Sequence, residues 1–375
     1  MCEINSHGGI IVVRKILELC LENGATLAEP GEFTKRAFLN GRIDLSQAES
    51  VIDIINAKSD IEAKEGVKQL EGFLSDKIKH IKKDLLDIMT NIEVSIDYPE
   101  YDTPELNEDE LRKKVIKIKD ELLKLKNSFD NGKIIREGIK TAIIGKPNAG
   151  KSSLLNAILK EERAIVTEYE GTTRDTIEEY ITIKGIPLKL VDTAGIRTTD
   201  NEVEKIGIEK SINTAKNADL IIVIIDSSRE LDQEDYSILN MVDHNKSIII
   251  LNKIDLDTKI SEENEYINKF KYIVKISALK KQGLEEIYSC IENMYNLNEI
   301  LLDNEIIITN QRHKNYIIQS IDELNKVEEN INKNMPVDII EIYLKNVLKN
   351  LGSITGEEAS EEIINEIFSR FCLGK

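Results

Sequence analysis

The chain has 375 residues, which is long enough for two or three domains with a buried core. Its hydrophobic content of 41% excludes a wholly disordered protein. The net charge of −18 disfavours tight binding of a phosphate backbone by the chain as a whole, so a nucleic-acid role would need a local basic patch or a partner protein. Four scattered cysteines without a C-x-x-C pair argue against structural zinc and a disulfide framework, and favour reduced thiols in the cytoplasm.

The first third of the chain has helical periodicity. Residues 1–40 combine a helix-like apolar run from Ile10 to Leu21 with a loop at Pro30-Gly31. From Asp44 to about Ile96 the apolar residues recur at helical spacing, and a further helix is expected from about Glu108 to Phe129. These stripes predict the core of a helical bundle.

The pattern changes between about Ile139 and Asn298, where short β-branched runs alternate with helical patterns. Runs of this kind predict buried parallel strands in a doubly wound α/β sheet. Helical periodicity returns from about Glu299 to Phe371, so we expect the α/β domain to be an insertion in a helical domain. No run approaches the roughly 20 residues of a membrane-spanning helix, and we expect no membrane association. The predicted strands are 141–144, 188–191, 220–225, 247–251 and 272–276.

A phosphate-binding motif follows the first predicted strand. The segment Gly145-Lys-Pro-Asn-Ala-Gly-Lys-Ser152 matches G-x-x-x-x-G-K-[ST] and opens a helix. Its glycines allow backbone N–H groups to surround phosphate oxygens at a helix N-terminus. Lys151 is expected to reach the β- and γ-phosphates during catalysis, and the Ser152 hydroxyl to bind Mg²⁺. The predicted phosphate-binding residues are Asn148, Ala149, Gly150, Lys151, Ser152 and Ser153.

Two later segments complete the expected phosphate site. Thr173, within Gly171-Thr-Thr-Arg-Asp175, is the best candidate for a second Mg²⁺ ligand that also clamps the γ-phosphate. Asp192-Thr193-Ala194-Gly195 follows the next long strand, so Asp192 is expected near the magnesium and the Gly195 N–H near the γ-phosphate.

Two further segments indicate guanine rather than adenine. A carboxylate at Asp255, in Asn252-Lys253-Ile-Asp255, can accept hydrogen bonds from both N1 and the 2-amino group of guanine, while Asn252 can bond the opposite edge. Ser277-Ala278 fits a backbone contact to the guanine O6. All these motifs lie in order at the ends of predicted strands, where open α/β sheets bind ligands. The sequence therefore predicts an enzyme that hydrolyses GTP to GDP and phosphate.

One expected catalytic group is absent from the usual place. Many small GTPases orient the attacking water with a Gln directly after the glycine of the D-x-x-G motif. Here Ile196 follows Gly195, and no arginine finger is evident within the domain. Another group should therefore supply the charge compensation and position the water.

Five segments outside the GTPase motifs are also distinctive: Ser6 to Gly9, Glu29 to Gly41, Asp44 to Glu49, Glu202 to Gly207 and Phe371 to Lys375. Together with the GTPase motifs, they give the chain a resemblance to the tRNA modification GTPases (the MnmE/TrmE family) over essentially its whole length. The resemblance implies an α/β P-loop GTPase domain at 139–298, inserted into an α-helical domain formed by 41–138 and 299–375. Residues 1–40 would be the remainder of an α+β N-terminal domain that binds folate and dimerises. That domain is longer in the family, so we expect the chain to begin inside it.

The resemblance also implies a replacement for the missing Gln. In this family K⁺ occupies the place of an arginine finger, and its ligands map onto Asn148, Thr167, Tyr169 and Thr172. A cation there would stabilise transition-state charge as a guanidinium does. The water-positioning glutamate maps onto Glu204 and would act when two GTPase domains meet. Hydrolysis should therefore be stimulated by K⁺ and activated by dimerisation through the N-terminal and GTPase domains.

The family forms the 5-carboxymethylaminomethyl-type modification of the wobble uridine in tRNA. It acts with a flavin-containing partner (MnmG/GidA), and a tetrahydrofolate derivative is the one-carbon donor. The resemblance implies folate contacts at Glu3, Arg42 and Lys375, and a role in the modification for Cys372. The acidic chain would contact tRNA mainly through the partner.

Two other functions stay open at this point. A ribosome-assembly GTPase of the Era or Der type should carry a basic RNA-binding domain with a G-x-x-G loop, or a second GTPase domain, and the sequence has neither. A GTP-gated scaffold would bind GTP without appreciable turnover. The missing Gln favours the scaffold, whereas Asn148 and Glu204 oppose it.

Overall fold

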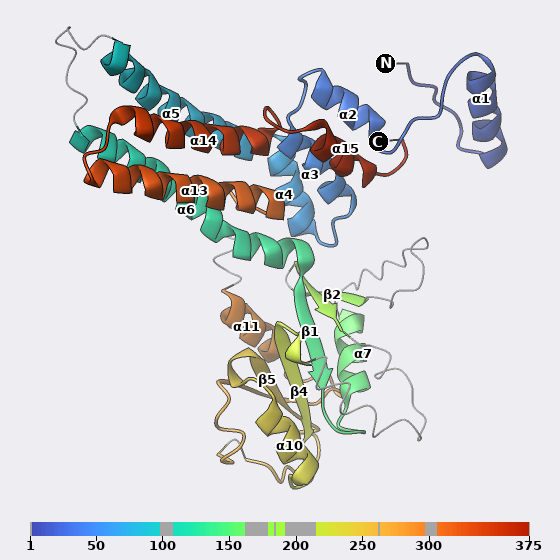
Figure 1. Ribbon diagram of the computed structural model, residues 1–375. Coiled ribbons are helices and arrows are strands. Elements are labelled where there is room, and N and C mark those ends of the chain that lie inside the picture. The colour runs from blue at the N-terminus through green and yellow to red at the C-terminus, as the bar shows by residue number, and fades with distance from the viewer. Residues whose placement is uncertain are drawn as a thin grey trace. The chain divides into compact units, whose positions relative to one another are not determined.

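Two units build the fold, and each is assembled from segments that lie far apart in the sequence. The first comprises Met1–Ile52, Lys68–Lys114 and Asp322–Lys375, and the second Asp53–Val67 and Val115–Ile321. The computed structural model describes residues 2–97, 108–161, 179–183, 185–191, 215–261, 263–296 and 306–374 (Figure 1).

Long helices with buried apolar stripes form the part of the chain before the sheet and after it. In the first unit α5 and α14 lie side by side (Figure 1), and the apolar residues of α5 from Ile78 to Ile92 recur every three or four positions. Ile78, Ile81, Leu85 and Ile92 of α5 and Leu344, Val347 and Leu351 of α14 are 0% exposed, so the helical periodicity marks the buried face. The helices are α1 (Ile10–Glu22), α2 (Glu32–Leu39), α3 (Leu45–Ile55), α4 (Asp60–Leu70), α5 (Phe73–Asp97), α6 (Glu108–Glu137), α13 (Gln311–Asn332), α14 (Val337–Thr355) and α15 (Glu361–Ser369).

An aromatic cluster in the first unit fixes the end of the chain. Phe368 and Phe371 are buried together with Leu45, and Phe38 packs against them. Gly31 has a φ of 68°, and a Cβ at this position would lie 2.9 Å from the Cβ of Phe371, so only glycine fits there.

The second unit contains a six-stranded sheet in the order β2-β3-β1-β4-β5-β6. β2 pairs antiparallel with β3, and every other neighbouring pair is parallel. Residues 220, 222 and 224 of β4 face the apolar core that includes α7 and α11, whereas 221, 223 and 225 face the core that includes α10. The uninterrupted apolar run of β4 therefore reflects burial on both faces. The elements are β1 (Ile139–Ile144), α7 (Lys151–Glu161), β2 (Glu179–Ile183), β3 (Ile186–Leu190), β4 (Leu220–Asp226), α10 (Gln233–Met241), the 3₁₀ helix η1 (His244–Lys246), β5 (Ser247–Asn252), β6 (Tyr272–Ile276) and α11 (Leu284–Tyr295).

This sheet confirms the predicted doubly wound, mainly parallel α/β fold. Each of the five predicted strands overlaps an observed one. The edge strand β2 was not predicted, although Tyr180 is followed by three β-branched residues and Gly185 supplies the positive φ of 87° for the turn into β3. The predicted helix after Glu108 continues beyond Phe129 to Glu137. The four domain ranges proposed from the sequence stay predictions.

Within the second unit, residues 53–67 contact the hairpin formed by β2 and β3. The ammonium of Lys58 donates a 2.7 Å hydrogen bond to the Tyr180 hydroxyl. A Cβ on Gly185 would lie 2.4 Å from Cδ1 of Ile61, so this side chain sits directly against the turn. The segment and the hairpin therefore meet through both polar and apolar contacts.

A buried carboxyl lies in the same segment. Glu62 is 7% exposed, and its carboxyl accepts a 2.6 Å hydrogen bond from the backbone N–H of Lys58. Burial raises the pKa of Glu62 from 4.5 to about 7, against the opposing effect of that hydrogen bond.

Replacing Glu62 with Gln is expected to stabilise the protein at about pH 8 and to have a smaller effect near pH 5. A carboxyl whose pKa rises from 4.5 to about 7 on folding binds a proton more tightly in the folded state. Stability is therefore highest below the unfolded-state pKa and is lost as the pH rises through this window, whereas Gln does not titrate. The gain should be on the order of 1–3 kcal/mol. Urea unfolding of both proteins at the two pH values measures it, and equal gains at both would contradict the buried-carboxyl interpretation.

Candidate functional site

The loop between β1 and α7 has a backbone that requires glycine at two positions. Gly145 has a φ of 152°, and a Cβ there would lie 2.4 Å from the carbonyl oxygen of Ile224. Gly150 has a φ of 108°, and its Cβ would lie 2.0 Å from Nδ2 of Asn252. The two motif glycines thus allow close approach of neighbouring chain segments on either side of the loop.

Lys151 lies across this loop at the start of α7. Its ammonium donates hydrogen bonds of 2.7 and 2.8 Å to the carbonyl oxygens of Gly145 and Lys146. Ser152 and Ser153 follow in the first turn of α7 and are exposed. A helix N-terminus beside a lysine and exposed hydroxyls is suited to binding phosphate.

The side chain of Asn252 joins the loop between β1 and α7 (residues 145–150, called the phosphate loop below) to the loop that follows β6. Its Nδ2 donates a 2.8 Å hydrogen bond to the carbonyl of Ala149, and its Oδ1 accepts a 3.0 Å bond from the N–H of Ala278. Asn252 is 3% exposed, so these bonds form in a dry environment. The prediction placed Asn252 at the edge of the base, and the structure adds this bridging role.

The carboxylate of Asp255 is held in place by a serine of the loop after β6. The hydroxyl of Ser277 donates a 2.6 Å hydrogen bond to Oδ1 of Asp255. This bond holds the pKa of Asp255 below its ordinary value. The carboxylate therefore stays ionised and keeps acceptor capacity for N–H donors of a ligand.

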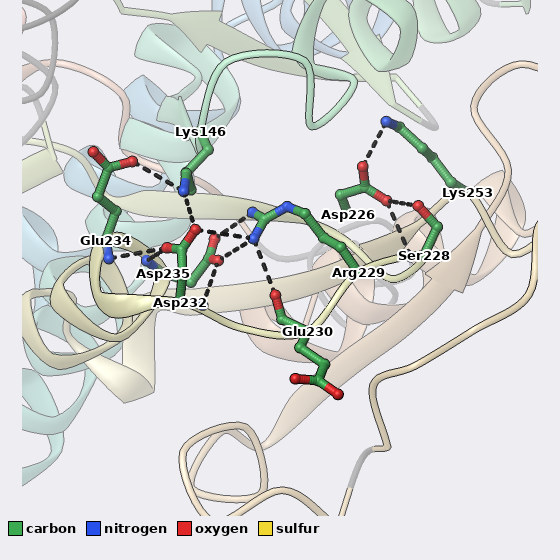
Figure 2. Close-up of polar contacts among 9 residues, drawn as sticks. All are labelled: Lys146, Asp226, Ser228, Arg229, Glu230, Asp232, Glu234, Asp235 and Lys253. Atoms are coloured by element: carbon green, nitrogen blue, oxygen red, sulfur yellow. Dashed lines mark hydrogen bonds and ion pairs between the residues drawn. The ribbon is translucent and has the colours of Figure 1, made fainter.

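An ionic cluster that the sequence did not reveal lies beside the phosphate loop. Lys146 pairs with Asp232 and, at 3.0 Å, with Glu234 (Figure 2). Arg229 binds both carboxylate oxygens of Asp235 at 2.7 and 2.9 Å. The ammonium of Lys146 lowers the pKa of Asp232 to about 2.

Asp232 also begins α10. Its carboxylate accepts hydrogen bonds from the N–H groups of Glu234 and Asp235. The carboxylate of Asp235 in turn accepts a hydrogen bond from the N–H of Asp232, which completes a capping box. The D-x-x-D spacing could have predicted this cap from the sequence. The ion pair with Lys146 could not be predicted, because it depends on how the two loops are placed in space.

The structure brings together part of the predicted site. These residues lie at one edge of the sheet, at the carboxyl ends of β1, β5 and β6, in the loops that follow them or in the first turn of α7. They are Asn148 through Ser153, Asn252, Lys253, Asp255, Ser277 and Ala278. The predicted residues outside the described part of the chain are Thr167, Tyr169, Thr172, Thr173, Asp192, Thr193, Ala194, Gly195, Glu204 and Lys375.

The remaining predicted residues belong to the first unit. Glu3 precedes α1 and Arg42 follows α2, and both are exposed. The thiol-bearing residue Cys372 is exposed, and its carbonyl accepts a 3.4 Å hydrogen bond from the N–H of Gly31. Within the described ranges there is no cluster of three His, Cys, Asp or Glu that could hold a metal ion. None of the helices described is both long and apolar enough to span a membrane.

Comparisons with known sequences agree over the whole chain. The family described as the MnmE helical domain matches residues 45–372, and the family described as the GTP-binding protein TrmE N-terminus matches residues 1–42. The tRNA modification GTPase MnmE of Acetivibrio thermocellus is 50% identical over 374 residues, which cover 100% of this chain and 82% of the relative. The protein of the same name from Clostridioides difficile is 49% identical, with coverage of 100% and 82%.

Solved structures give weaker similarities. The G domain of the T. maritima FeoB iron transporter is 28% identical, with a TM-score of 0.30 over 42% of this chain and 98% of that one. Era from Aquifex aeolicus, bound to GDP and AlF4⁻, is 23% identical, with a TM-score of 0.29 over 49% of this chain and 66% of that one. Neither TM-score is high enough to add to what the strand order already establishes about the fold.

Replacing Asn252 with Ala is expected to destabilise the protein by about 2–4 kcal/mol and to weaken GDP binding at least about tenfold. The substitution leaves the Ala149 carbonyl and the Ala278 N–H buried without their partner. Urea unfolding and titration with a fluorescent GDP analogue measure the two effects.

Asn245→Ala provides the matched control, since Asn245 is an exposed asparagine of η1. It should change neither quantity. Wild-type GDP affinity in Asn252→Ala would contradict a bridging role for this side chain.

Proposed function

Because the chain belongs to the tRNA modification GTPase (MnmE) family, we propose that it couples GTP hydrolysis to modification of the wobble uridine of tRNA. It is a GTP hydrolase, like the tRNA modification GTPases whose sequences it matches. The observation that carries the proposal is the Asn252 bridge, which sets the phosphate loop beside the loop that follows β6.

The chain's own residues suit the binding of GTP phosphates. Lys151 already bridges the loop carbonyls, and the N-terminus of α7 presents N–H groups to an anion. Negative charge that develops on the γ-phosphate during hydrolysis would be stabilised by these groups, which are in place before the reaction begins.

A magnesium ion fits the donor set near Ser152. Its hydroxyl is exposed at the first turn of α7, and hard oxygen ligands are what Mg²⁺ prefers. We propose Ser152 and Thr173 as ligands, with Asp192 and the Gly195 N–H nearby. When bound, Mg²⁺ would neutralise charge on the β- and γ-phosphate oxygens.

A potassium ion fits Asn148 in the same way. This residue has a φ of 60° and is exposed, so its side-chain oxygen is accessible at the phosphate loop. We propose that Thr167, Tyr169 and Thr172 complete the site. When bound, K⁺ would supply the positive charge that an arginine finger supplies elsewhere.

Water positioning is assigned to Glu204, which we propose becomes active when two GTPase domains meet. Dimerisation would also involve the N-terminal domain. These assignments rest on the family resemblance, since Glu204 lies outside the described residues.

The tRNA chemistry is likewise proposed from the family. A tetrahydrofolate derivative fits Glu3, Arg42 and Lys375, because a pterin offers N–H donors to a carboxylate and the folate tail offers carboxylates to cations. The exposed thiol of Cys372 is accessible for a role in the modification. A flavoprotein of the MnmG/GidA type would be the partner, and it would hold most of the tRNA because this chain carries a net charge of −18.

Potassium should stimulate GTP hydrolysis strongly relative to sodium at equal ionic strength, and Asn148→Ala should abolish the difference. A cation that bridges the phosphates could contribute up to about 10³-fold, the lower range of an arginine finger. Steady-state phosphate release in matched KCl and NaCl buffers measures it, with Asn245→Ala as the control. Equal, weak turnover in both salts alongside intact GTP binding would favour a GTP-gated scaffold instead.

Asp255→Asn should weaken GTP binding by at least about 100-fold and improve binding of xanthosine triphosphate. Guanine offers two N–H donors to the carboxylate. Xanthine has a carbonyl in place of the 2-amino group, which the Asn amide can donate to. Competition of each nucleotide against fluorescent GDP measures the change, and unchanged preference for GTP would exclude Asp255 from the base contact.

A further inference from the structure

Lys253, the second residue of the predicted guanine-binding segment, is anchored by Asp226, which lies outside the nucleotide-binding motifs identified in the sequence. Its ammonium donates a 2.6 Å hydrogen bond to Oδ2 of Asp226, and Figure 2 shows the two side chains facing each other. Asp226 is the last residue of β4 and lies opposite Asn252 in the register of β4 and β5. The sheet itself therefore places the carboxylate beside the lysine.

The second carboxylate oxygen of Asp226 is also occupied. Oδ1 accepts hydrogen bonds of 3.0 Å from the N–H of Ser228 and 2.6 Å from its hydroxyl. Asp226 is 9% exposed, and burial opposes its ionisation. The hydrogen bonds from Lys253 and Ser228 outweigh burial and lower the pKa of Asp226, so the group is a fixed anion.

The backbone next to Lys253 is fixed as well. Lys253 has a φ of 68°, in the left-handed region that few residues other than glycine adopt. The carbonyl of Asn252 accepts bonds of 2.9 Å from the N–H of Ser227 and 2.7 Å from its hydroxyl. The Lys253 side chain is nevertheless 31% exposed, so part of it can meet a ligand.

We propose that Asp226 is a positioning residue for guanine nucleotides and acts through Lys253. With its ammonium anchored, the four-carbon stem of Lys253 is held in place and would offer an apolar surface to the face of the base whose edge Asp255 binds. Ordering a free lysine side chain costs conformational entropy. Asp226 orders it before the nucleotide binds, which strengthens binding by preorganisation.

The test is a double-mutant cycle on the full-length chain, with the dissociation constant of fluorescent GDP as the readout. Asp226→Asn retains the shape of the side chain and loses its charge, and it should weaken binding about tenfold. Lys253→Met should weaken binding by at least as much. Adding Asp226→Asn to Lys253→Met should then change the constant by less than about twofold, because the residue through which Asp226 acts is already gone.

Asp257→Asn serves as the matched control, because Asp257 is exposed and follows the same predicted guanine-binding segment. It should leave the dissociation constant unchanged. Thermal unfolding without nucleotide separates a binding effect from a folding defect. If Asp226→Asn does not fold, Asp226→Glu replaces it in the cycle, with an expected loss of about threefold that again disappears beside Lys253→Met.

Equal weakening by the Asp226 substitution in both backgrounds would overturn the proposal, as would wild-type affinity in a folded Asp226→Asn. The proposal rests on GTP binding at this site. Failure of the wild-type chain to bind GDP would therefore refute that binding, whereas loss of coupling alone refutes the role of Asp226.

Discussion

The carboxyl ends of the parallel strands lie at one edge of the sheet. There the buried side-chain amide of Asn252 connects the loop after β1 with the loop after β6. Asn252 spans from the carbonyl of Ala149 to the N–H of Ala278, two segments separated by more than a hundred residues. The close approach that this requires explains why Gly150 carries no side chain. The proposed phosphate and base subsites are therefore parts of one hydrogen-bonded assembly, and their spacing is set by the register of β4 and β5 and of β5 and β6.

Much of this arrangement was readable from the sequence because it depends on local patterns. The apolar run of β4 must be buried on both faces, and the glycine spacing around Lys151 demands a loop between a strand and a helix. The observed sheet confirms the predicted fold class, and the relatives confirm the family of GTP hydrolases. Two ion pairs could not be predicted, namely Lys146 with Asp232 and Lys253 with Asp226. Charged residues give no periodic signal in the sequence, and the partners of these lysines come together only in the folded sheet.

Strand β2 was not predicted for a different reason. It is a short edge strand, paired on one side only, and the run of five residues contains both apolar and polar side chains. Without the strong hydrophobicity of a central strand, its pattern is hard to distinguish from a loop. Its position became clear only from the antiparallel register with β3, in which Tyr180 lies opposite Lys189.

The hairpin of β2 and β3 has a mechanical consequence. In the sequence it lies between the segment that carries Thr173 and the segment that begins with Asp192. Through Tyr180 and Gly185 the same hairpin contacts Lys58 and Ile61. A shift of the hairpin that accompanies a change of nucleotide must either carry residues 53–67 with it or break those contacts. Any movement of the hairpin would thus be resisted by a segment that lies more than a hundred residues earlier in the chain.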